Sequence, residues 1–279
     1  MALDIQGANV VAAGHTLLSD IHLNIAPGEH IAVVGPSGAG KSSLLGLLLG
    51  WHQAVGGSVL VDSEPLEGKQ ILQLRRETAW LDPAIQIWNR SLLENLRYSP
   101  GAGPYPDLGQ IMENANLTQV LARLPEGLQN PLGEGGARLS GGEGQRVRLG
   151  RALWQQGVRL ALLDEPFRGL DREQRCRHLT EARNFWRKAT LVCVTHDVAE
   201  TRSFSRVVVI ENGQIVEDGC PEELAATAGS RYHALLAMEE SLRDELWGGS
   251  VWRRIRVEDS ELREAPLVYL TGKSAARHE

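Results

Sequence analysis

A glycine-rich segment followed by lysine and serine carries the clearest chemistry in this sequence. It reads Gly-Pro-Ser-Gly-Ala-Gly-Lys-Ser over residues 35–42. Its glycines let successive backbone N–H groups point inward at phosphate oxygens, and a following helix adds the positive end of its dipole. Lys41 would reach the β and γ phosphates, and the Ser42 hydroxyl would bind Mg²⁺. The sequence therefore predicts a nucleoside triphosphate site formed by Gly35, Pro36, Ser37, Gly38, Ala39, Gly40, Lys41, Ser42 and Ser43.

A second glycine-containing segment narrows the kind of nucleotide-binding protein. It reads Leu-Ser-Gly-Gly-Glu-Gly-Gln-Arg over residues 139–146. Phosphate loops also occur in kinases and GTPases, so the first segment alone does not name the reaction. In the second, Ser140 and the two glycines after it can present a hydroxyl and bare amides at a helix start, with Glu143 onward in the helix. A kinase acting on a small molecule would leave residues 140–146 unexplained.

The two motifs, in this order, resemble those of ATP-binding cassette (ABC) ATPases, in which residues 139–146 match the signature motif. Asp164 and Glu165 resemble the Walker B aspartate, which holds Mg²⁺, and the carboxylate that orients or deprotonates the attacking water. Gly169-Leu170-Asp171 resembles the loop that passes signals across a cassette dimer, and His196 resembles the switch histidine at the γ-phosphate. The resemblance implies catalytic roles for Lys41, Glu165 and His196, with Ser42 and Asp164 as magnesium ligands.

The same resemblance implies cofactors and partners. ABC cassettes pack head to tail, and each ATP lies between the phosphate loop of one subunit and the signature motif of the other. The residues expected to act in trans are Ser140, Gly141, Gly142, Glu143 and Asp171. We expect ATP and Mg²⁺ as cofactors. A second cassette, identical or different, and the transmembrane domains of a transporter are the expected partners. That role implies a cytoplasmic location, peripheral on the cytoplasmic face of the inner or plasma membrane.

Three segments resemble the exporter branch of the family. Leu124–Leu128 and Gly133–Gly136 resemble the stretch that touches the coupling helices of the membrane domain, and Ser91–Arg97 resembles the exporter helix after the glutamine loop. The expected function is therefore the ATPase of an exporter. The alternative is a soluble ABC ATPase that acts as a mechanical switch in assembly, translation or DNA repair. Such proteins often carry two cassettes or a long coiled-coil insertion, which this sequence does not show.

Two positions depart from the family pattern. Counted from the flanking motifs, the glutamine expected in the loop between the subdomains falls at Pro83. Asp82 is the candidate replacement for its metal or water contact, with Gln86 as a second choice, although Asp-Pro is equally an ordinary turn opener. Between Val10 and His15, where the family usually stacks an aromatic ring on adenine, there is no Tyr, Phe or Trp. These departures concern base selectivity and coupling to transport.

Short apolar runs must form the strands that position these residues. Four of them, typical of buried parallel strands, are separated by helical stretches: residues 31–34, 160–163, 191–194 and 207–210. The phosphate loop, Asp164 and His196 follow three of these strands at the carboxyl ends, where α/β folds place chemistry. The first 34 residues alternate like a small β-sheet. We therefore expect an α/β fold: a P-loop NTPase (RecA-like) core with a mostly parallel sheet, an N-terminal antiparallel β subdomain, and an α-helical subdomain, about 84–150, that carries the signature motif.

Length and charge limit the remaining possibilities. The chain has 279 residues, 29 basic and 35 acidic, for a net charge of −6, which disfavours a surface that grips nucleic acid. The three cysteines form no C-x-x-C pair and are expected as free thiols. No apolar run approaches the roughly 18 to 20 residues of a membrane span, so we expect that part in a partner. The expected domains are a cassette over 1–225 and, over 226–279, a helical extension and tail of unknown role.

Overall fold

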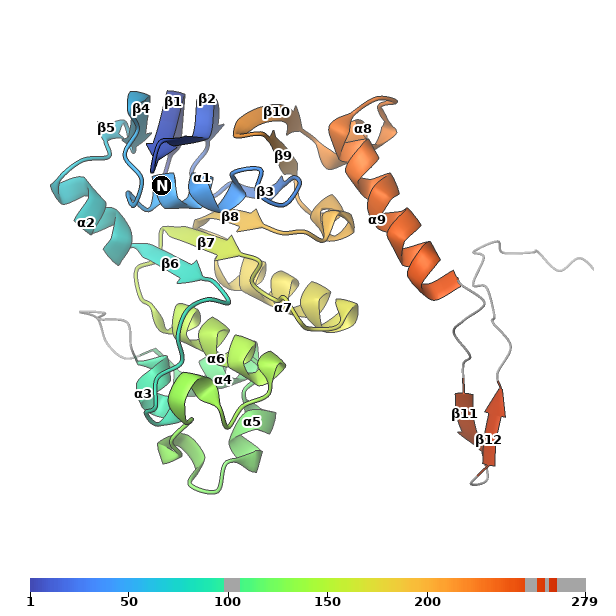
Figure 1. The fold of residues 1–279 in the computed structure, drawn as a ribbon. Coiled ribbons are helices and arrows are strands. Elements are labelled where there is room, and N and C mark those ends of the chain that lie inside the picture. The colour runs from blue at the N-terminus through green and yellow to red at the C-terminus, as the bar shows by residue number, and fades with distance from the viewer. Residues whose placement is uncertain (98–105, 249–254, 259–260, 265–279) are drawn as a thin grey trace, which may run out of the picture. The chain divides into compact units, whose positions relative to one another are not determined.

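A six-stranded sheet forms the centre of the molecule (Figure 1). In the computed structural model, the structure describes residues 1–97, 106–248, 255–258 and 261–264. The strand order is β10-β9-β3-β8-β7-β6, with all neighbours parallel except β10, which runs antiparallel to β9. The strands are β3 (His30–Val34), β6 (Thr78–Leu81), β7 (Leu160–Asp164), β8 (Thr190–Val194), β9 (Arg206–Glu211) and β10 (Gln214–Gly219). The four apolar runs predicted as buried strands lie in this sheet.

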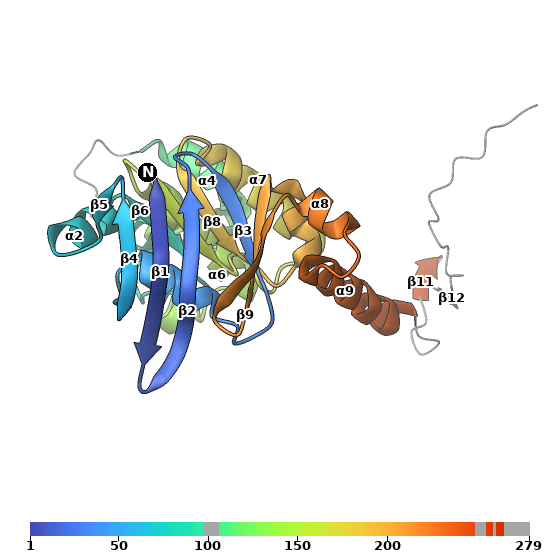
Figure 2. The same ribbon diagram turned by 90° about the horizontal axis from the view of Figure 1, so that it is seen from above.

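The N-terminal segment forms the expected antiparallel subdomain. Its strand order is β2-β1-β4-β5, and Figure 2 shows β4, β1 and β2 side by side. The strands are β1 (Leu3–Ala12), β2 (His15–Ile25), β4 (Gly56–Val61) and β5 (Glu64–Pro65). Buried and less buried residues alternate along β1, as expected for a strand with one face in the core.

Helix α1 (Lys41–Leu48) packs between the two sheets. Its leucines belong to one hydrophobic cluster with Leu3 and Ile5 of the antiparallel sheet and Ile31 and Val33 of the central sheet. The buried leucines of this helix are Leu44, Leu45, Leu47 and Leu48. Because α1 directly follows the phosphate loop, this packing holds the loop against the rigid centre of the molecule.

A second hydrophobic cluster joins the other face of the central sheet to the helical subdomain. The helices between the first sheet and the last central strands are α2 (Lys69–Arg76), α3 (Leu92–Leu96), α4 (Leu108–Asn114), α5 (Thr118–Arg123), α6 (Gly141–Trp154) and α7 (Arg172–Phe185). Short 3-10 helices lie at η1 (Gly127–Gln129), η2 (Glu134–Gly136) and η3 (Val198–Ser203). The signature motif begins α6, so the expected helical subdomain is present.

The C-terminal segment begins with α8 (Pro221–Ala226) and α9 (Arg231–Gly248). The chain divides into two compact units, Met1–Leu236 and Ala237–Glu279. The second contains a short antiparallel pair, β11 (Ile255–Glu258) and β12 (Glu261–Glu264), which the sequence patterns did not indicate. The domain boundary expected after residue 225 stays a prediction. Among the described residues, no helix is both long and apolar enough to cross a membrane.

Candidate functional site

A pocket of about 620 Å³ brings together residues from five separate parts of the chain. The phosphate loop, Glu165 after β7 and His196 after β8 all line it. Two segments missed by sequence reasoning complete the wall: Thr16 and Leu17 in β2, and Asn212 and Gly213 in the turn between β9 and β10. The Asn-Gly pair is a hairpin-turn signal that was available in the sequence, but only the fold places that turn beside the phosphate loop.

Close backbone packing explains the glycines of the phosphate loop. A Cβ atom at Gly35 would lie 2.0 Å from the Ile210 carbonyl oxygen, and Gly35 has a φ of 148°. Gly40, with a φ of 106°, precedes the first turn of α1. The Gly213 N–H donates to the Ala39 carbonyl at 2.9 Å, which braces the loop from the β9–β10 turn. The phosphate loop is therefore held directly before the N-terminus of α1, and its role in binding an anion there stays a prediction.

Lys41 is almost fully buried at the base of this loop, with 6% of its surface exposed. Its Nζ donates to the carbonyls of Gly35 and Pro36, each at 2.8 Å. Burial lowers the pKa of Lys41, while the negative charges of Glu165 and Asp164 oppose that shift. The ammonium group is thus held inside the loop, where a phosphate can exchange with the two carbonyls.

Asp164, at the end of β7, lies next to Ser42. A hydrogen bond joins the two side chains, and burial is the main cause that raises the pKa of Asp164. The charges of Asp82 and Glu165 raise that pKa further, while Ser42 and Lys41 lower it. A poorly hydrated carboxylate beside a hydroxyl, with other carboxylates near, fits a divalent cation that would neutralise this charge.

Asp82 has a local structural role next to Pro83, the position of the missing glutamine. Its Oδ1 accepts a hydrogen bond from the Ala84 N–H at 2.6 Å, so Asp82-Pro83 opens a turn. The charge of Asp82 nevertheless acts on Asp164. The side chain of Gln86 is exposed, and its backbone carbonyl accepts a hydrogen bond from Arg151 Nη1 at 3.0 Å. The metal role of Asp82 stays a prediction.

Glu165 and His196 contact each other across neighbouring strands. The His196 Nε2 meets the Glu165 Oε1, and Arg168 Nη1 lies 3.6 Å from the other carboxylate oxygen. Glu165 has a φ of 43°, in the left-handed region that a glutamate rarely adopts, and its N–H donates to the Val194 carbonyl at 2.9 Å. Unusual backbone conformations of this kind concentrate at functional sites. The pairing of β7 with β8 therefore brings both predicted catalytic side chains to the phosphate loop.

The signature residues lie away from this pocket. Ser140 caps α6 in a capping box: its hydroxyl accepts from the Glu143 N–H at 3.4 Å, and the Glu143 carboxylate accepts from the Ser140 N–H at 2.8 Å. Arg123 of α5 forms an ion pair with Glu143. Ser140 and Gly141 are exposed, and neither lines the pocket, nor does Asp171, which caps α7 through the Gln174 N–H at 2.9 Å. One chain thus presents the start of the signature motif, Ser140 and Gly141, to solvent and not to its own phosphate loop, whereas Glu143 is buried.

The fold and the pocket define a P-loop ATPase with an added helical subdomain. Residues 18–168 match the family model described as ABC transporter, and this is more than half of the chain. The chain therefore belongs to the ABC transporter family. The expected fold class, ATP binding and exporter resemblance are confirmed.

Similar proteins include an ATP-dependent lipid A-core flippase of Burkholderia orbicola (strain AU 1054), 34% identical over 80% of this chain and 37% of the flippase. The mitochondrial ATP-dependent permease MDL1 of Saccharomyces cerevisiae is 32% identical over 90% of this chain and 36% of the permease. A solved bacterial Atm1-family ABC exporter with ATP bound matches with a TM-score of 0.79 at 24% identity, over 86% of this chain and 42% of the exporter. The chain thus spans little more than a third of the length of these two curated relatives. Their names, a flippase and a permease, give no support to the alternative of a non-transport ATPase.

Proposed function

We propose that this chain binds ATP with Mg²⁺, pairs head to tail with a second ABC cassette, and drives the transmembrane domains of an exporter by ATP hydrolysis. One observation carries this proposal: the phosphate loop, Glu165 and His196 line one pocket, whereas Ser140 faces solvent at the N-terminus of α6. The phosphate site and the signature surface of one chain are therefore separate. Head-to-tail pairing would bring the phosphate site of each chain against the signature surface of the other.

The residues of the pocket divide the work of phosphoryl transfer. The loop amides, Lys41 and the N-terminus of α1 would hold the β and γ phosphates. Ser42 and Asp164 would hold Mg²⁺, because a hydrogen bond joins their side-chain oxygens and the Asp164 carboxylate is poorly hydrated. Asp82 is a further candidate ligand, because its charge acts on Asp164. A bound magnesium ion neutralises charge on the phosphate oxygens. The expected Mg²⁺ cofactor is part of this proposal.

Glu165 and His196 would act at the γ-phosphate. The carboxylate of Glu165 would orient the attacking water and accept its proton, and the contact with His196 keeps the two groups together. His196, half exposed at the end of β8, would donate a hydrogen bond to a γ-phosphate oxygen. Both side chains come from strand ends, so their placement depends on the central sheet and not on a long loop.

The proposed partners follow from the exposed signature motif and from the relatives. Ser140, Gly141, Gly142 and Glu143, with Asp171, would contact ATP held by the partner cassette. The relatives are named as an ATP-dependent flippase and an ATP-dependent permease, and the match covers only 37% and 36% of their lengths. We therefore place this chain on the cytoplasmic face of a membrane, against transmembrane domains that select the transported substrate.

The catalytic assignment is tested by exchanging Glu165→Gln and Lys41→Ala in separate proteins. The Gln variant should bind ATP as the wild type does but lose at least about 100-fold in turnover, because the proton acceptor is gone. The Ala variant should lose nucleotide affinity, because Lys41 no longer faces the phosphates. Phosphate release and binding of a fluorescent ATP analogue measure the two effects. Undiminished turnover in the Gln variant would remove Glu165 from the catalytic role.

Action in trans is tested by Ser140→Arg. A bulky cation at the start of α6 should block dimer closure and hydrolysis, while binding of ATP to the single chain stays unchanged. Wild-type turnover per chain should also rise with protein concentration as dimers form. A fully active Arg variant, or turnover independent of concentration, would contradict head-to-tail pairing.

A further inference from the structure

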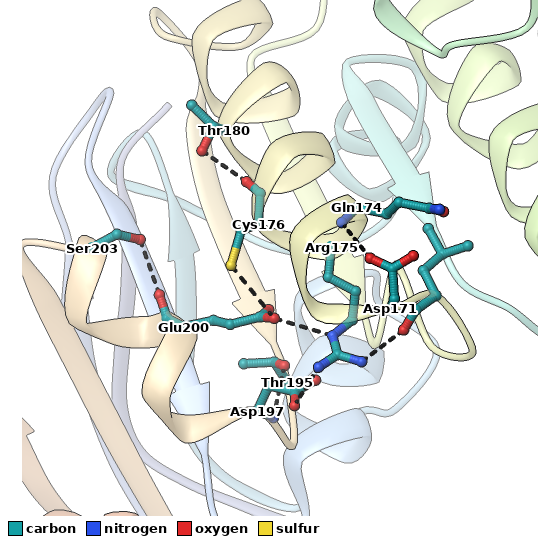
Figure 3. Close-up of polar contacts among 10 residues, drawn as sticks. Asp171, Gln174, Arg175, Cys176, Thr180, Thr195, Asp197, Glu200 and Ser203 are labelled. Carbon is teal, nitrogen blue, oxygen red and sulfur yellow. Dashed lines mark hydrogen bonds and ion pairs between the residues drawn. The ribbon is translucent and has the colours of Figure 1, made fainter. Parts of the chain in front are cut away.

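Arg175 joins two loops that the proposed mechanism places at different ends of the site. Its Nη1 donates to the Leu170 carbonyl at 2.8 Å, its Nη2 to Asp197 at 3.0 Å, and its Nε to Glu200 at 3.0 Å. Figure 3 shows the guanidinium group between the loop that contains Asp171 and the segment that contains Asp197 and Glu200. All three guanidinium nitrogens donate hydrogen bonds, an arrangement that the single ammonium group of a lysine could not reproduce.

The first end of this bridge is the loop expected to contact the partner cassette. Leu170 directly precedes Asp171, whose carboxylate caps α7, the helix that carries Arg175. Leu170 also packs close to the signature motif, because a Cβ atom at Gly142 would lie 2.8 Å from the Leu170 side chain. A shift of this loop therefore reaches Arg175 through the Leu170 carbonyl.

The second end is the segment that follows His196. Asp197 stands at the N-terminus of η3, yet its carboxylate makes no cap to that helix and instead accepts from Arg175. Its backbone N–H is held by the Thr195 hydroxyl at 3.1 Å. Glu200, one turn later, has a side chain only 7% exposed. Arg175 thus binds the carboxylates of Asp197 and Glu200 at the start of η3, directly after His196.

We propose that Arg175 is a positioning residue that couples the place of the Gly169–Asp171 loop to the place of His196. The inference rests on the proposed function, since it concerns how the partner cassette reaches the hydrolytic site. When the partner contacts Asp171, the Leu170 carbonyl and Arg175 move as one unit with Asp197. The His196 imidazole is then held where it contacts the γ-phosphate and Glu165.

The burial of the bridge gives it the stiffness that this role needs. The Arg175 side chain is 21% exposed, and burial would lower its pKa; the hydrogen bond to Glu200 and the charges of Asp197 and Glu200 outweigh this and raise it. The guanidinium group therefore stays charged throughout the working pH range. A partly buried, charge-assisted fork holds its partners more strongly than an exposed ion pair does.

The test compares Arg175→Met and Arg175→Lys with Arg177→Met in the full chain. Arg177 lies on the same helix, but its side chain is 65% exposed and pairs with Glu181 one turn further along that helix. The Met variant at 175 should lower kcat about 10- to 100-fold, since small misplacements of catalytic groups have such effects, and should leave nucleotide affinity within about twofold. The Lys variant keeps the charge and should fall between that variant and the wild type.

A second readout does not depend on hydrolysis. NMR signals of the His196 imidazole, assigned with His196→Gln, should shift in both Arg175 variants and stay in place in the Arg177 variant. Unchanged His196 signals together with wild-type kcat would overturn the proposal, as would equal losses of kcat and nucleotide affinity. If the wild type hydrolyses no ATP, the proposed function fails, while the imidazole signals still decide whether Arg175 positions His196.

Discussion

At the scale of single residues, the surroundings of Asp164 and Asp62 shift the pKa values of these two side chains in opposite directions, with opposite effects on stability. Burial, Asp82 and Glu165 raise the pKa of Asp164. The folded chain therefore binds the Asp164 proton more tightly than the unfolded chain does, and the ionised carboxylate lowers the free energy of unfolding above the folded pKa. That cost disappears as the pH falls through the folded pKa. Asp164 is retained, in our proposal, for its magnesium ion.

We predict that Asp164→Asn raises the midpoint of thermal unfolding at neutral pH, because it removes a poorly hydrated charge. The gain over the wild type should shrink as the pH falls through the folded pKa of Asp164. Nucleotide affinity should become insensitive to Mg²⁺ in the same variant. Thermal scans over a pH series and nucleotide titrations with and without Mg²⁺ measure the two effects; a less stable Asn variant at neutral pH would contradict the electrostatic argument.

Asp62 supplies the matched control with the opposite sign. Burial alone would raise its pKa, but the hydrogen bond from the Ala2 N–H at 2.8 Å and the ion pair with Arg159 at 2.7 Å lower it. Its ionised form stabilises the fold above the ordinary carboxyl pKa, and this contribution is lost as the pH falls through the folded pKa. Asp62→Asn should therefore lower the unfolding midpoint at neutral pH, by a small amount because Asp62 is partly exposed.

At the scale of elements, α6 carries both the signature motif and the support of the loop between the subdomains. Arg151, only 7% exposed, donates from Nε to the Asn95 carbonyl at 2.8 Å, from Nη1 to the Gln86 carbonyl at 3.0 Å and from Nη2 to the Asn95 side chain at 2.8 Å. Arg148 holds the Ile85 carbonyl at 2.6 Å. The backbone carbonyls of the segment after Pro83 are therefore bound by arginine side chains of α6.

We predict that Arg151→Met lowers the free energy of unfolding by about 2–4 kcal/mol, because buried acceptors lose a charged donor. Arg138→Met is the control, since Arg138 is exposed and bonds the Pro131 carbonyl at the surface at 3.2 Å; it should change stability by less than about 0.5 kcal/mol. Urea unfolding of both variants measures the difference. Equal stabilities would show that Arg151 does not support this loop.

At the scale of the whole molecule, the start of α9 belongs to the cassette. The Glu217 carboxylate on β10 accepts from the Ser230 hydroxyl at 2.9 Å, the Arg231 N–H at 2.6 Å and the Tyr232 N–H at 2.9 Å. Tyr232 is fully buried, and its hydroxyl bonds Thr201 at 2.8 Å. The first compact unit accordingly extends to Leu236.

We predict that a chain ending at Leu236 unfolds at nearly the same temperature as the full chain. A chain ending at residue 225 should be less stable by about 3 kcal/mol or more, because it loses a buried aromatic side chain and leaves the cap formed by Glu217 without a helix. Thermal unfolding of the two truncated proteins measures this. Equal stability would support the boundary after residue 225 that the sequence motifs indicate.

Local chemistry could be predicted from the sequence because its determinants are neighbours in the chain. The phosphate loop needs glycines with positive φ directly before a helix start, and Gly35, Gly38 and Gly40 meet that need. The Ser140 cap depends on a residue three positions later. Buried parallel strands appear as uninterrupted apolar runs. These patterns predicted an α/β fold and a nucleoside triphosphate site, whereas the candidate catalytic residues came from the resemblance of the motifs to the ABC family.

Only the tertiary structure decided which of these residues meet. The contact of Glu165 with His196 depends on the register of β7 against β8, and the place of Asn212 in the pocket wall depends on β9 beside β3. Ser140 lies away from the phosphate loop of its own chain, and Arg175 bridges loops more than 20 positions apart. Such contacts join segments that are distant in the chain, and a linear pattern does not contain the strand pairing that brings them together.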